Sequence, residues 1–238
     1  MTTPTLAQRV QQLDWAKLGA DLVANGWAVT PQVLDDAEVS ALVQSYDRPE
    51  LFRSRVVMQR HAYGQGEYQY FQRPLPAPVD ELRHAFFPHL SVIANDWAEK
   101  LGEAAGFPDD LDAYLARCHD AGQLRPTPLL LKYGPGDYNR LHQDLYGPLN
   151  FPLQAVFLLS RPGVDFEGGE LVLTETRARM QTRPMVVPLG FGQAAIMAVN
   201  NRPVASPRGY SRAGLRHGVS EVRSGRRHTM GLIFHDAT

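Results

Sequence analysis

The second half of the chain is a series of short apolar or alternating segments separated by turns that contain glycine or proline. These segments are shorter than ordinary helices and have the composition of strands buried on one or both faces. Turn residues occur between them as Gly134-Pro135-Gly136-Asp137, Arg161-Pro162-Gly163 and Arg223-Ser224-Gly225. The pattern therefore predicts a mainly β core. The expected strands are 129–133, 138–141, 154–159, 168–173, 215–222 and 226–234.

Residue types that bind metals lie at the end of one expected strand. His142 and Asp144 are two positions apart, and alternate residues of an extended chain lie on the same face. Two imidazoles and one carboxylate can hold Fe(II) on one side and leave other coordination positions open. We therefore predict that His142, Asp144 and the later His217 are metal ligands and catalytic residues. The other histidines show no ligand spacing and are assigned no chemistry: His61, His84, His89, His119, His228 and His235.

A candidate anion-binding pair lies on the last expected strand. Alternation places Arg227, Thr229 and Gly231 on one face of this strand and turns Arg226 away from that face. A guanidinium and a hydroxyl two residues apart can bind one carboxylate together, because the guanidinium contacts both oxygens and the hydroxyl adds a donor. We therefore expect Arg227 and Thr229 to anchor an acidic cosubstrate.

The ordered combination of these residues resembles the Fe(II)- and 2-oxoglutarate-dependent dioxygenases, especially their prolyl-hydroxylase-like branch. The matching pattern is Tyr133-x-x-Gly136-x-Tyr138-x-x-x-His142-x-Asp144, then Gly168-Gly169-Glu170-Leu171, then His217, Val222, Gly225 and Arg227. The resemblance covers roughly 129–234 and implies a double-stranded β-helix core of the jelly-roll or cupin type. It also implies iron on the three ligands named above and 2-oxoglutarate on Arg227 with Thr229. Tyr133 either packs in the core or donates a hydrogen bond to 2-oxoglutarate.

The activity implied by this resemblance is hydroxylation of a substrate with O2, coupled to decarboxylation of 2-oxoglutarate to succinate. The closing stretch, 217–236, is also similar to a small bacterial family of oxygenases linked to oxidative repair of alkylated DNA bases. The residues rank a protein side chain or a small molecule ahead of nucleic acid as substrate, and they leave the oligomeric state open. Two other classes remain as alternatives, namely a zinc-type hydrolase with the same ligands and a non-catalytic jelly-roll binding protein.

The first half of the chain has a different pattern, which predicts an α+β molecule with flanking helices. We expect one domain over 1–238, in which 1–125 supplies mostly helical support and substrate loops and 126–236 is the catalytic β core. The loop from Tyr63 to Tyr68, which contains Gly64 and Gly66, forms either an ordinary hairpin turn or a lid over the metal. The expected helices are 6–25, one that opens at 35–38, 79–105 and 111–118, with a short strand at 27–30 and a hairpin of 55–58 with 67–71.

Charge is informative only when the chain is divided. The formal net charge is -1, yet residues 161–238 contain eleven Arg and six acidic residues. Between 199 and 228, seven arginines accompany the single acid Glu221, which suits an anionic substrate. The sequence pI near 6.7, however, is not typical of a strong nucleic-acid binder. The single Cys118 rules out an intramolecular disulfide. With no long apolar run and no leader motif at 1–4, a cytoplasmic protein without membrane association is expected.

Overall fold

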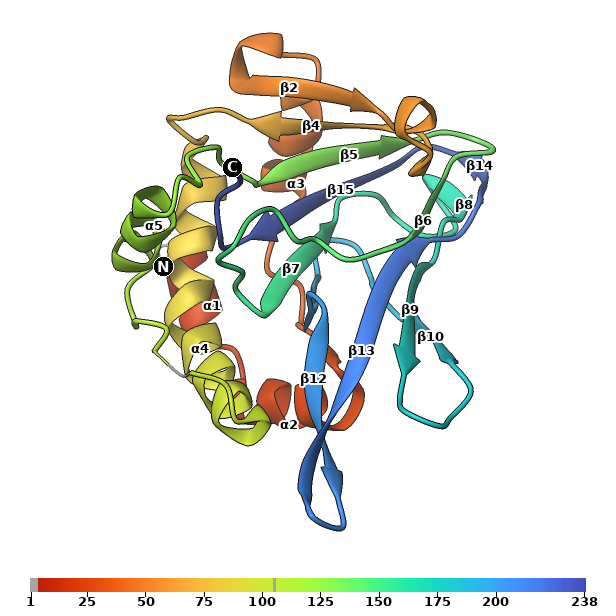
Figure 1. The fold of residues 1–238 in the computed structure, drawn as a ribbon. Helices are drawn as coiled ribbons and strands as arrows, with labels where there is room; N and C mark the ends of the chain where they lie inside the picture. Colours follow the sequence, from red (N-terminus) through yellow and green to blue (C-terminus); the bar gives the residue numbers. More distant parts are fainter. Residues whose placement is uncertain (1–3, 105) are drawn as a thin grey trace.

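Two antiparallel β-sheets face each other in the computed structural model, which describes residues 4–104 and 106–238 (Figure 1). The larger sheet contains, in spatial order, β1 (Trp27–Val29), β11 (Ala194–Ala198), β7 (Leu153–Leu158), β15 (Arg227–Ile233), β5 (Leu129–Tyr133), β4 (Glu67–Phe71) and β2 (Phe52–Val57). The smaller sheet contains β10 (Arg183–Val187), β9 (Leu171–Thr176), β13 (Gly209–Val219), β6 (Tyr138–His142) and β3 (Gly64–Gln65), with β12 (Asn201–Ser206) also paired to β13. The predicted mainly β architecture with a double-stranded β-helix core is confirmed.

The pairing of strands explains how distant segments reach one site. In the larger sheet β15 lies between β7 and β5, with Thr229 opposite Leu158 on one side and Leu131 on the other. In the smaller sheet β13 pairs with β6, and His217 lies directly opposite His142. The inward faces of these strands therefore bring the last strand of the chain together with the two histidines.

Helices support the larger sheet from its outer side. They are α1 (Leu6–Gln11), α2 (Trp15–Asn25), α3 (Asp36–Ser45), α4 (Ala77–Leu101) and α5 (Leu111–Asp120), with short 3-10 turns at Pro49–Leu51 and Met58–His61. Phe86 of α4 packs edge-on against Phe157 of β7, with ring centroids 5.8 Å apart. Phe87, on the same helix, contacts Phe151 and Phe234. None of the helices in the described residues is long and apolar enough to cross a bilayer.

Three predicted element boundaries were wrong. The single helix expected over 6–25 is two helices. Asp14 is the N-cap of α2, because its side chain accepts a hydrogen bond from the Lys17 backbone N–H, and a new helix begins there. The helix expected over 79–105 begins at Ala77, runs through Pro88 and ends at Leu101, where Gly102 takes a left-handed conformation; position 105 lies outside the described residues. The expected turn at 223–225 is part of strand β14 (Val222–Gly225), which pairs with β8 (Phe166–Gly168).

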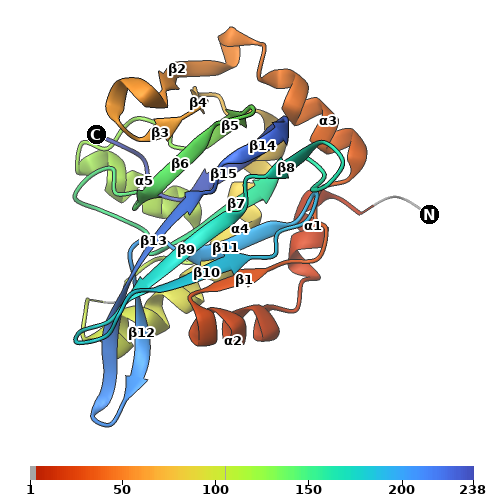
Figure 2. The ribbon, with the colours of Figure 1, turned by 90° about the vertical axis from the view of Figure 1, so that its right-hand side faces the viewer.

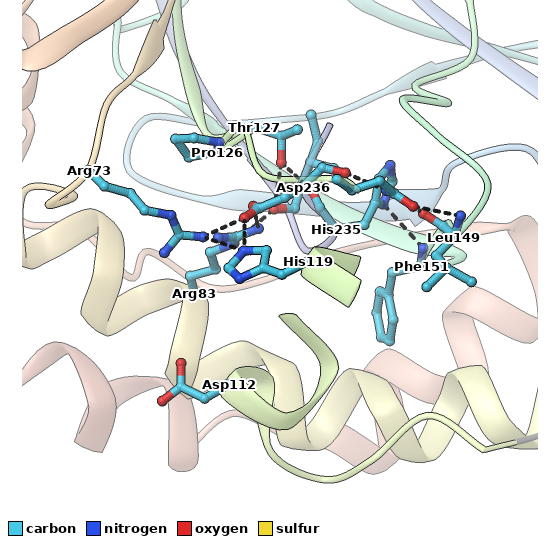
Figure 3. A network of polar contacts seen from close by, with 12 residues as sticks. Arg73, Arg83, Asp112, His119, Pro126, Thr127, Leu149, Phe151, His235 and Asp236 are labelled. Atoms are coloured by element: carbon cyan, nitrogen blue, oxygen red, sulfur yellow. Dashed lines mark hydrogen bonds and ion pairs between the residues drawn. The ribbon is translucent and has the colours of Figure 1, made fainter. Parts of the chain in front are cut away.

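A buried ionic cluster ties the end of the last strand to the helical support (Figure 3). The carboxylate of Asp236 is fully buried and accepts hydrogen bonds from Arg83 of α4 at 3.0 Å, from His119 of α5 at 3.0 Å, and from Arg73. Arg83 is itself 1% exposed and also donates to the Ile233 carbonyl. The cluster therefore fixes the position of β15 relative to α4 and α5.

Replacing Asp236 by asparagine should destabilise the fold strongly. The change keeps the size of the side chain but leaves the buried Arg83 guanidinium without a counter-charge, which typically costs about 3–5 kcal/mol. The free energy of unfolding, measured by urea denaturation, gives this cost directly. Asp112→Asn is the matched control, because Asp112 forms an exposed pair with His84 outside the cluster and should change stability little. Equal stability of the two variants would contradict the structural role of the cluster.

Candidate metal and cosubstrate site

The three predicted ligands converge between the two sheets. His142 is the last residue of β6, Asp144 follows two positions later, and His217 lies on the paired strand β13. The Nε2 atom of His142 is 3.5 Å from Oδ1 of Asp144, and Nε2 of His217 is 3.3 Å from Oδ2 of Asp144. One ligand atom from each residue lies within 4.8 Å of the others. This spacing suits three ligands on one face of a single metal ion.

Neighbouring groups hold the ligands in orientations that fit a metal. The Nδ1 atom of His142 lies 2.7 Å from the Arg140 carbonyl, so an N–H at that position donates to it and leaves Nε2 free to coordinate. The Gln143 side chain donates to the Leu215 carbonyl at 2.8 Å and so ties the ligand loop to β13. The Tyr146 hydroxyl donates to Oδ1 of Asp144 at 2.7 Å. These contacts fix the carboxylate and one imidazole before any ion arrives.

The protonation states of the ligands also fit metal binding. Burial and the nearby His217 lower the pKa of His142, which favours the neutral imidazole that a metal needs. Burial by itself would raise the pKa of Asp144, but the charge and hydrogen bond of His217, with smaller effects from His142 and Tyr146, hold it below its usual range. Asp144 therefore stays anionic at neutral pH, as an oxygen ligand of a metal ion must be.

The ligands open into a cavity of about 520 Å³ that also contains the predicted anion-binding residues. Arg227, Thr229, Gly231 and Ile233 of β15 all line it, as strand alternation predicts. Tyr133 of β5 lines it as well. Arg226 lies outside this cavity, on a separate hollow of the surface, in agreement with its expected orientation. One cavity thus combines a metal-type ligand set with a guanidinium and a hydroxyl.

Arg227 is a buried cation that forms no ion pair with a carboxylate of the described residues. Its side chain is 1% exposed, and its Nε and Nη1 atoms have no hydrogen-bond partner among the described residues. The guanidinium carbon lies 5.5 Å from the centre of the Tyr133 ring and 5.8 Å from that of Phe166. Burial lowers the pKa of Arg227 to about 10, which still leaves it charged at neutral pH. A buried, unpaired guanidinium is costly, so this geometry fits a site completed by a bound carboxylate.

Gly169 makes room for this arginine. A Cβ atom at position 169 would lie 2.8 Å from Cδ of Arg227, and the residue has φ +60°. Gly168, with φ +73°, ends β8 beside β14. Both glycines lie at the break between β8 and β9. Gly169 additionally admits the side chain that would hold the cosubstrate.

Some residues of the cavity were not anticipated from the sequence. Tyr146 follows Asp144 by two positions, the same spacing that relates Asp144 to His142. This spacing could have predicted that Tyr146 lies on the same side of the chain as the carboxylate that it contacts. Tyr68 and Tyr70 of β4 also line the cavity, because β4 joins the larger sheet beside β5. Within the 63–68 loop, Tyr63 lines the cavity and Gly64–Gln65 forms β3, which pairs with β6. The loop is therefore a wall of the cavity, and its role as a lid remains a prediction.

The run of arginines between 199 and 228 does not form one patch. Arg202 is buried and forms an ion pair with Glu175, because strand alternation turns it inward. Arg227 lies in the cavity, and Arg212 pairs with Glu103 next to the end of α4. The number of arginines in this stretch of sequence is therefore larger than the number that any one surface presents.

Comparison with protein families decides the class of the enzyme. Residues 66–237 match the family model Oxygenase-NA, described as an oxygenase that catalyses oxidative methylation of damaged DNA. The chain belongs to this oxygenase family. It is also 50% identical over 167 residues to the uncharacterized protein Rv2227 of Mycobacterium tuberculosis, a match that covers 70% of this chain and 72% of that protein. The hydrolase and the non-catalytic binding protein are thereby set aside.

The fold of this oxygenase is shared with solved structures of low sequence identity. A prolyl-4-hydroxylase from Pseudomonas putida has a TM-score of 0.54 and 16% identity over 94% of this chain and 99% of its own. An oxidoreductase of the 2OG-Fe(II) oxygenase family from Burkholderia pseudomallei has a TM-score of 0.56 and 14% identity, covering 94% and 93% of the two chains. The similarity supports the predicted jelly-roll core.

Proposed function

We propose that this oxygenase uses Fe(II), 2-oxoglutarate and O2. The observation that carries the proposal is the buried Arg227, which has no ion-pair partner in the described part of the chain and shares a cavity with His142, Asp144 and His217. A metal-dependent hydrolase with the same ligands has no use for a buried guanidinium, whereas a dicarboxylate cosubstrate needs one. With these groups bound, the site supplies hydroxylation, in which 2-oxoglutarate becomes succinate and CO2 and one oxygen atom enters a substrate C–H bond.

The protein residues bind and orient the cosubstrate in this scheme. Arg227 and Thr229 hold its distal carboxylate, and the apolar side chains of Leu131, Val156 and Leu171 exclude water around its carbon chain. Burial raises the pKa of Tyr133 to about 12, so its hydroxyl keeps its proton and can donate a hydrogen bond. The proposed reaction requires no general base from the protein, because none of these side chains transfers a proton to or from the substrate.

The substrate of the proposed oxygenase is a damaged base in DNA. The sequence ranked a protein side chain or a small molecule first, whereas the description of the matching family supports damaged DNA. The cavity walls support the reversal. Tyr68, Tyr70 and Tyr146 line the cavity with successive ring planes 89° apart, and enzymes that act on a base commonly hold it against aromatic side chains. Hydroxylation of an N-methyl group gives a hydroxymethyl group, which leaves as formaldehyde and restores the base.

Anaerobic calorimetry tests the cofactor assignment without turnover. We expect 2-oxoglutarate to bind only after Fe(II) or Mn(II) has been added. In air, Fe(II) should support succinate release that increases with a methylated oligonucleotide and not with a proline-containing peptide. Binding of 2-oxoglutarate that is absent, or equal with and without metal, would disprove the proposed cofactors. Stimulation by the peptide alone would disprove the proposed substrate.

A further inference from the structure

Asp144 is the predicted metal ligand that lies on a loop. His142 ends β6 and His217 lies on β13, so the pairing of these two strands fixes the backbone of both histidines. Asp144 follows β6 in the irregular loop 143–152, which leads to β7. A carboxylate on such a loop must either be ordered when the metal binds, at an entropic cost, or be held in place by other parts of the fold.

The side chain of Gln123 is bonded to this loop through both ends of its amide. Its Nε2 atom donates to the Leu149 carbonyl at 2.9 Å, and its Oε1 atom accepts from the Leu149 N–H at 2.8 Å. Nε2 also donates to the Asp236 carbonyl. Gln123 is fully buried, and its amide uses both N–H groups and its oxygen in these bonds. Loss of the amide would therefore leave buried backbone groups without their partner.

Gln123 is itself held by the helical support. After a turn at Gly122, which has φ +84°, the Gln123 N–H donates to the Cys118 carbonyl of α5 at 2.9 Å. Asp236, which accepts from the Gln123 amide, is anchored through its carboxylate to Arg83 of α4. Figure 2 shows the C-terminus beside α5, on the side of the molecule where the loop between β6 and β7 passes. Gln123 thus links the loop to two parts of the fold that other contacts hold in position.

Gly147 allows the loop to pass directly over this amide. A Cβ atom at position 147 would lie 2.5 Å from Cδ of Gln123 and 2.8 Å from its Nε2 atom, so any side chain there would push the loop and the amide apart. The Gly147 carbonyl accepts from Nδ2 of Asn150 at 2.8 Å, and Oδ1 of Asn150 accepts from the Tyr146 N–H at 3.3 Å. The part of the loop in contact with Gln123 is therefore joined to Tyr146.

Tyr146 connects this part of the loop to the metal ligand. Its hydroxyl donates to Oδ1 of Asp144 at 2.7 Å. The last residues of the chain support the same stretch, because the Thr238 N–H donates to the Tyr146 carbonyl at 3.1 Å. The Phe151 N–H donates to Nδ1 of His235, also at 3.1 Å (Figure 3). A displacement of the loop would therefore reach the carboxylate through Tyr146.

We propose that Gln123 is a positioning residue for the metal site, which holds the 143–152 loop so that Tyr146 and Asp144 are in place for the ion. The inference rests on the proposed function, since it concerns the metal of that site. Gln123 is not among the described residues that line the cavity, so it acts on the ion only through the loop. Loss of its amide should weaken metal binding by about tenfold, the lower end of the effect of removing a group that supports a metal ligand.

Calorimetric titration with Mn(II) tests the proposal. Gln123→Met keeps the length of the side chain and removes its amide, and the dissociation constant for Mn(II) should rise about tenfold. Gln69→Met is the matched control. Gln69 is also a buried glutamine, but its amide donates to the Tyr46 carbonyl, on the face of β4 that is turned away from the cavity. Its Mn(II) affinity should equal that of the parent. Urea denaturation of each variant shows whether it is folded during the titration.

A second variant keeps the test decisive if Gln123→Met does not fold. Gly147→Ala moves the loop away from Gln123 without removing a hydrogen-bonding group, and Gly147 has no positive φ that an alanine would strain. It should also bind Mn(II) about tenfold more weakly. Gln123→Met combined with Tyr146→Phe distinguishes positioning from a general loss of stability. Because Gln123 acts through Tyr146, the double variant should bind Mn(II) little more weakly than Tyr146→Phe alone, whereas independent effects would multiply.

The outcomes separate this inference from the proposed function. Unchanged Mn(II) affinity in folded Gln123→Met or Gly147→Ala overturns the role of Gln123 alone. An equal loss in Gln69→Met, or multiplied effects in the double variant, also overturns it. Absence of Mn(II) binding by the parent overturns the proposed function and this inference with it. Weaker Mn(II) binding by both loop variants, in a protein that does not bind 2-oxoglutarate, would support the role of Gln123 and overturn the proposed cosubstrate.

Discussion

Replacement of Asp144 by alanine should abolish metal binding and, with it, all 2-oxoglutarate turnover. Asp144 is the only anionic member of the triad and lies within 3.5 Å of both imidazole Nε2 atoms. Loss of a hydrogen-bond partner behind a metal ligand already costs about 10–100-fold in metal affinity, so loss of the carboxylate itself should cost more than about 100-fold. Calorimetric titration with Mn(II) measures this loss directly.

A second variant tests the hydrogen bond that holds Asp144 in place and leaves the carboxylate itself intact. Tyr146→Phe removes only the hydroxyl that donates to Oδ1 of Asp144, and we expect metal affinity to fall by about 10–100-fold. Tyr63→Phe is the matched control, because Tyr63 lines the same cavity and has no side-chain contact with the carboxylate among the described residues. Full metal affinity in Asp144→Ala would show that the ion binds elsewhere.

The second large effect is expected at Arg227. Replacing it by glutamine should weaken 2-oxoglutarate binding by about 2–5 kcal/mol, because the distal carboxylate would enter a buried site without its cation. At 1.4 kcal/mol for each factor of ten, this corresponds to at least about 30-fold in the dissociation constant. Metal binding should stay unchanged, since Arg227 lies on the opposite sheet from His142 and His217. Calorimetry with Mn(II) and 2-oxoglutarate separates the two events.

The free energy of unfolding tests the role of Arg227 independently of 2-oxoglutarate binding. Without cosubstrate, Arg227 is a buried charge whose Nε and Nη1 atoms have no hydrogen-bond partner within residues 4–104 and 106–238, so its removal should not lower the free energy of unfolding of the free protein. Arg226→Gln is the matched control for affinity, because this neighbouring arginine faces outside the cavity. If Arg226→Gln weakened 2-oxoglutarate binding as much as Arg227→Gln, the assignment of the anchor would be wrong.

Alternation along strands accounts for the part of the site that was predictable. It placed Arg227 and Thr229 on one face of the last strand, and it related His142 to Asp144, because side-chain direction in a strand is a local property. The same rule applied to β12 would have turned Arg202 inward. Instead, Arg202 was grouped with its neighbours by charge alone, and its buried pair with Glu175 was missed.

The features that were not predicted depend on contacts between distant segments. The cluster of Asp236 with Arg83 joins residues 153 positions apart, and no local pattern reveals such a pair. Strand β14 was taken for a turn because Arg-Ser-Gly has turn composition, yet pairing with β8 extends it. The break before α2 depends on a single cap at Asp14, which the helical spacing of apolar residues obscured.

The placement of the candidate ligands and the proposed anchor on different sheets has a consequence for the choice of cosubstrate. His142 and His217 belong to the smaller sheet, whereas Arg227 and Thr229 belong to the larger one. A keto acid bound at both ends would bridge the sandwich, so the separation of the sheets acts as a ruler for carbon-chain length. Core substitutions that widen or narrow the sandwich would then alter which dicarboxylic acids are accepted, even where they touch neither end.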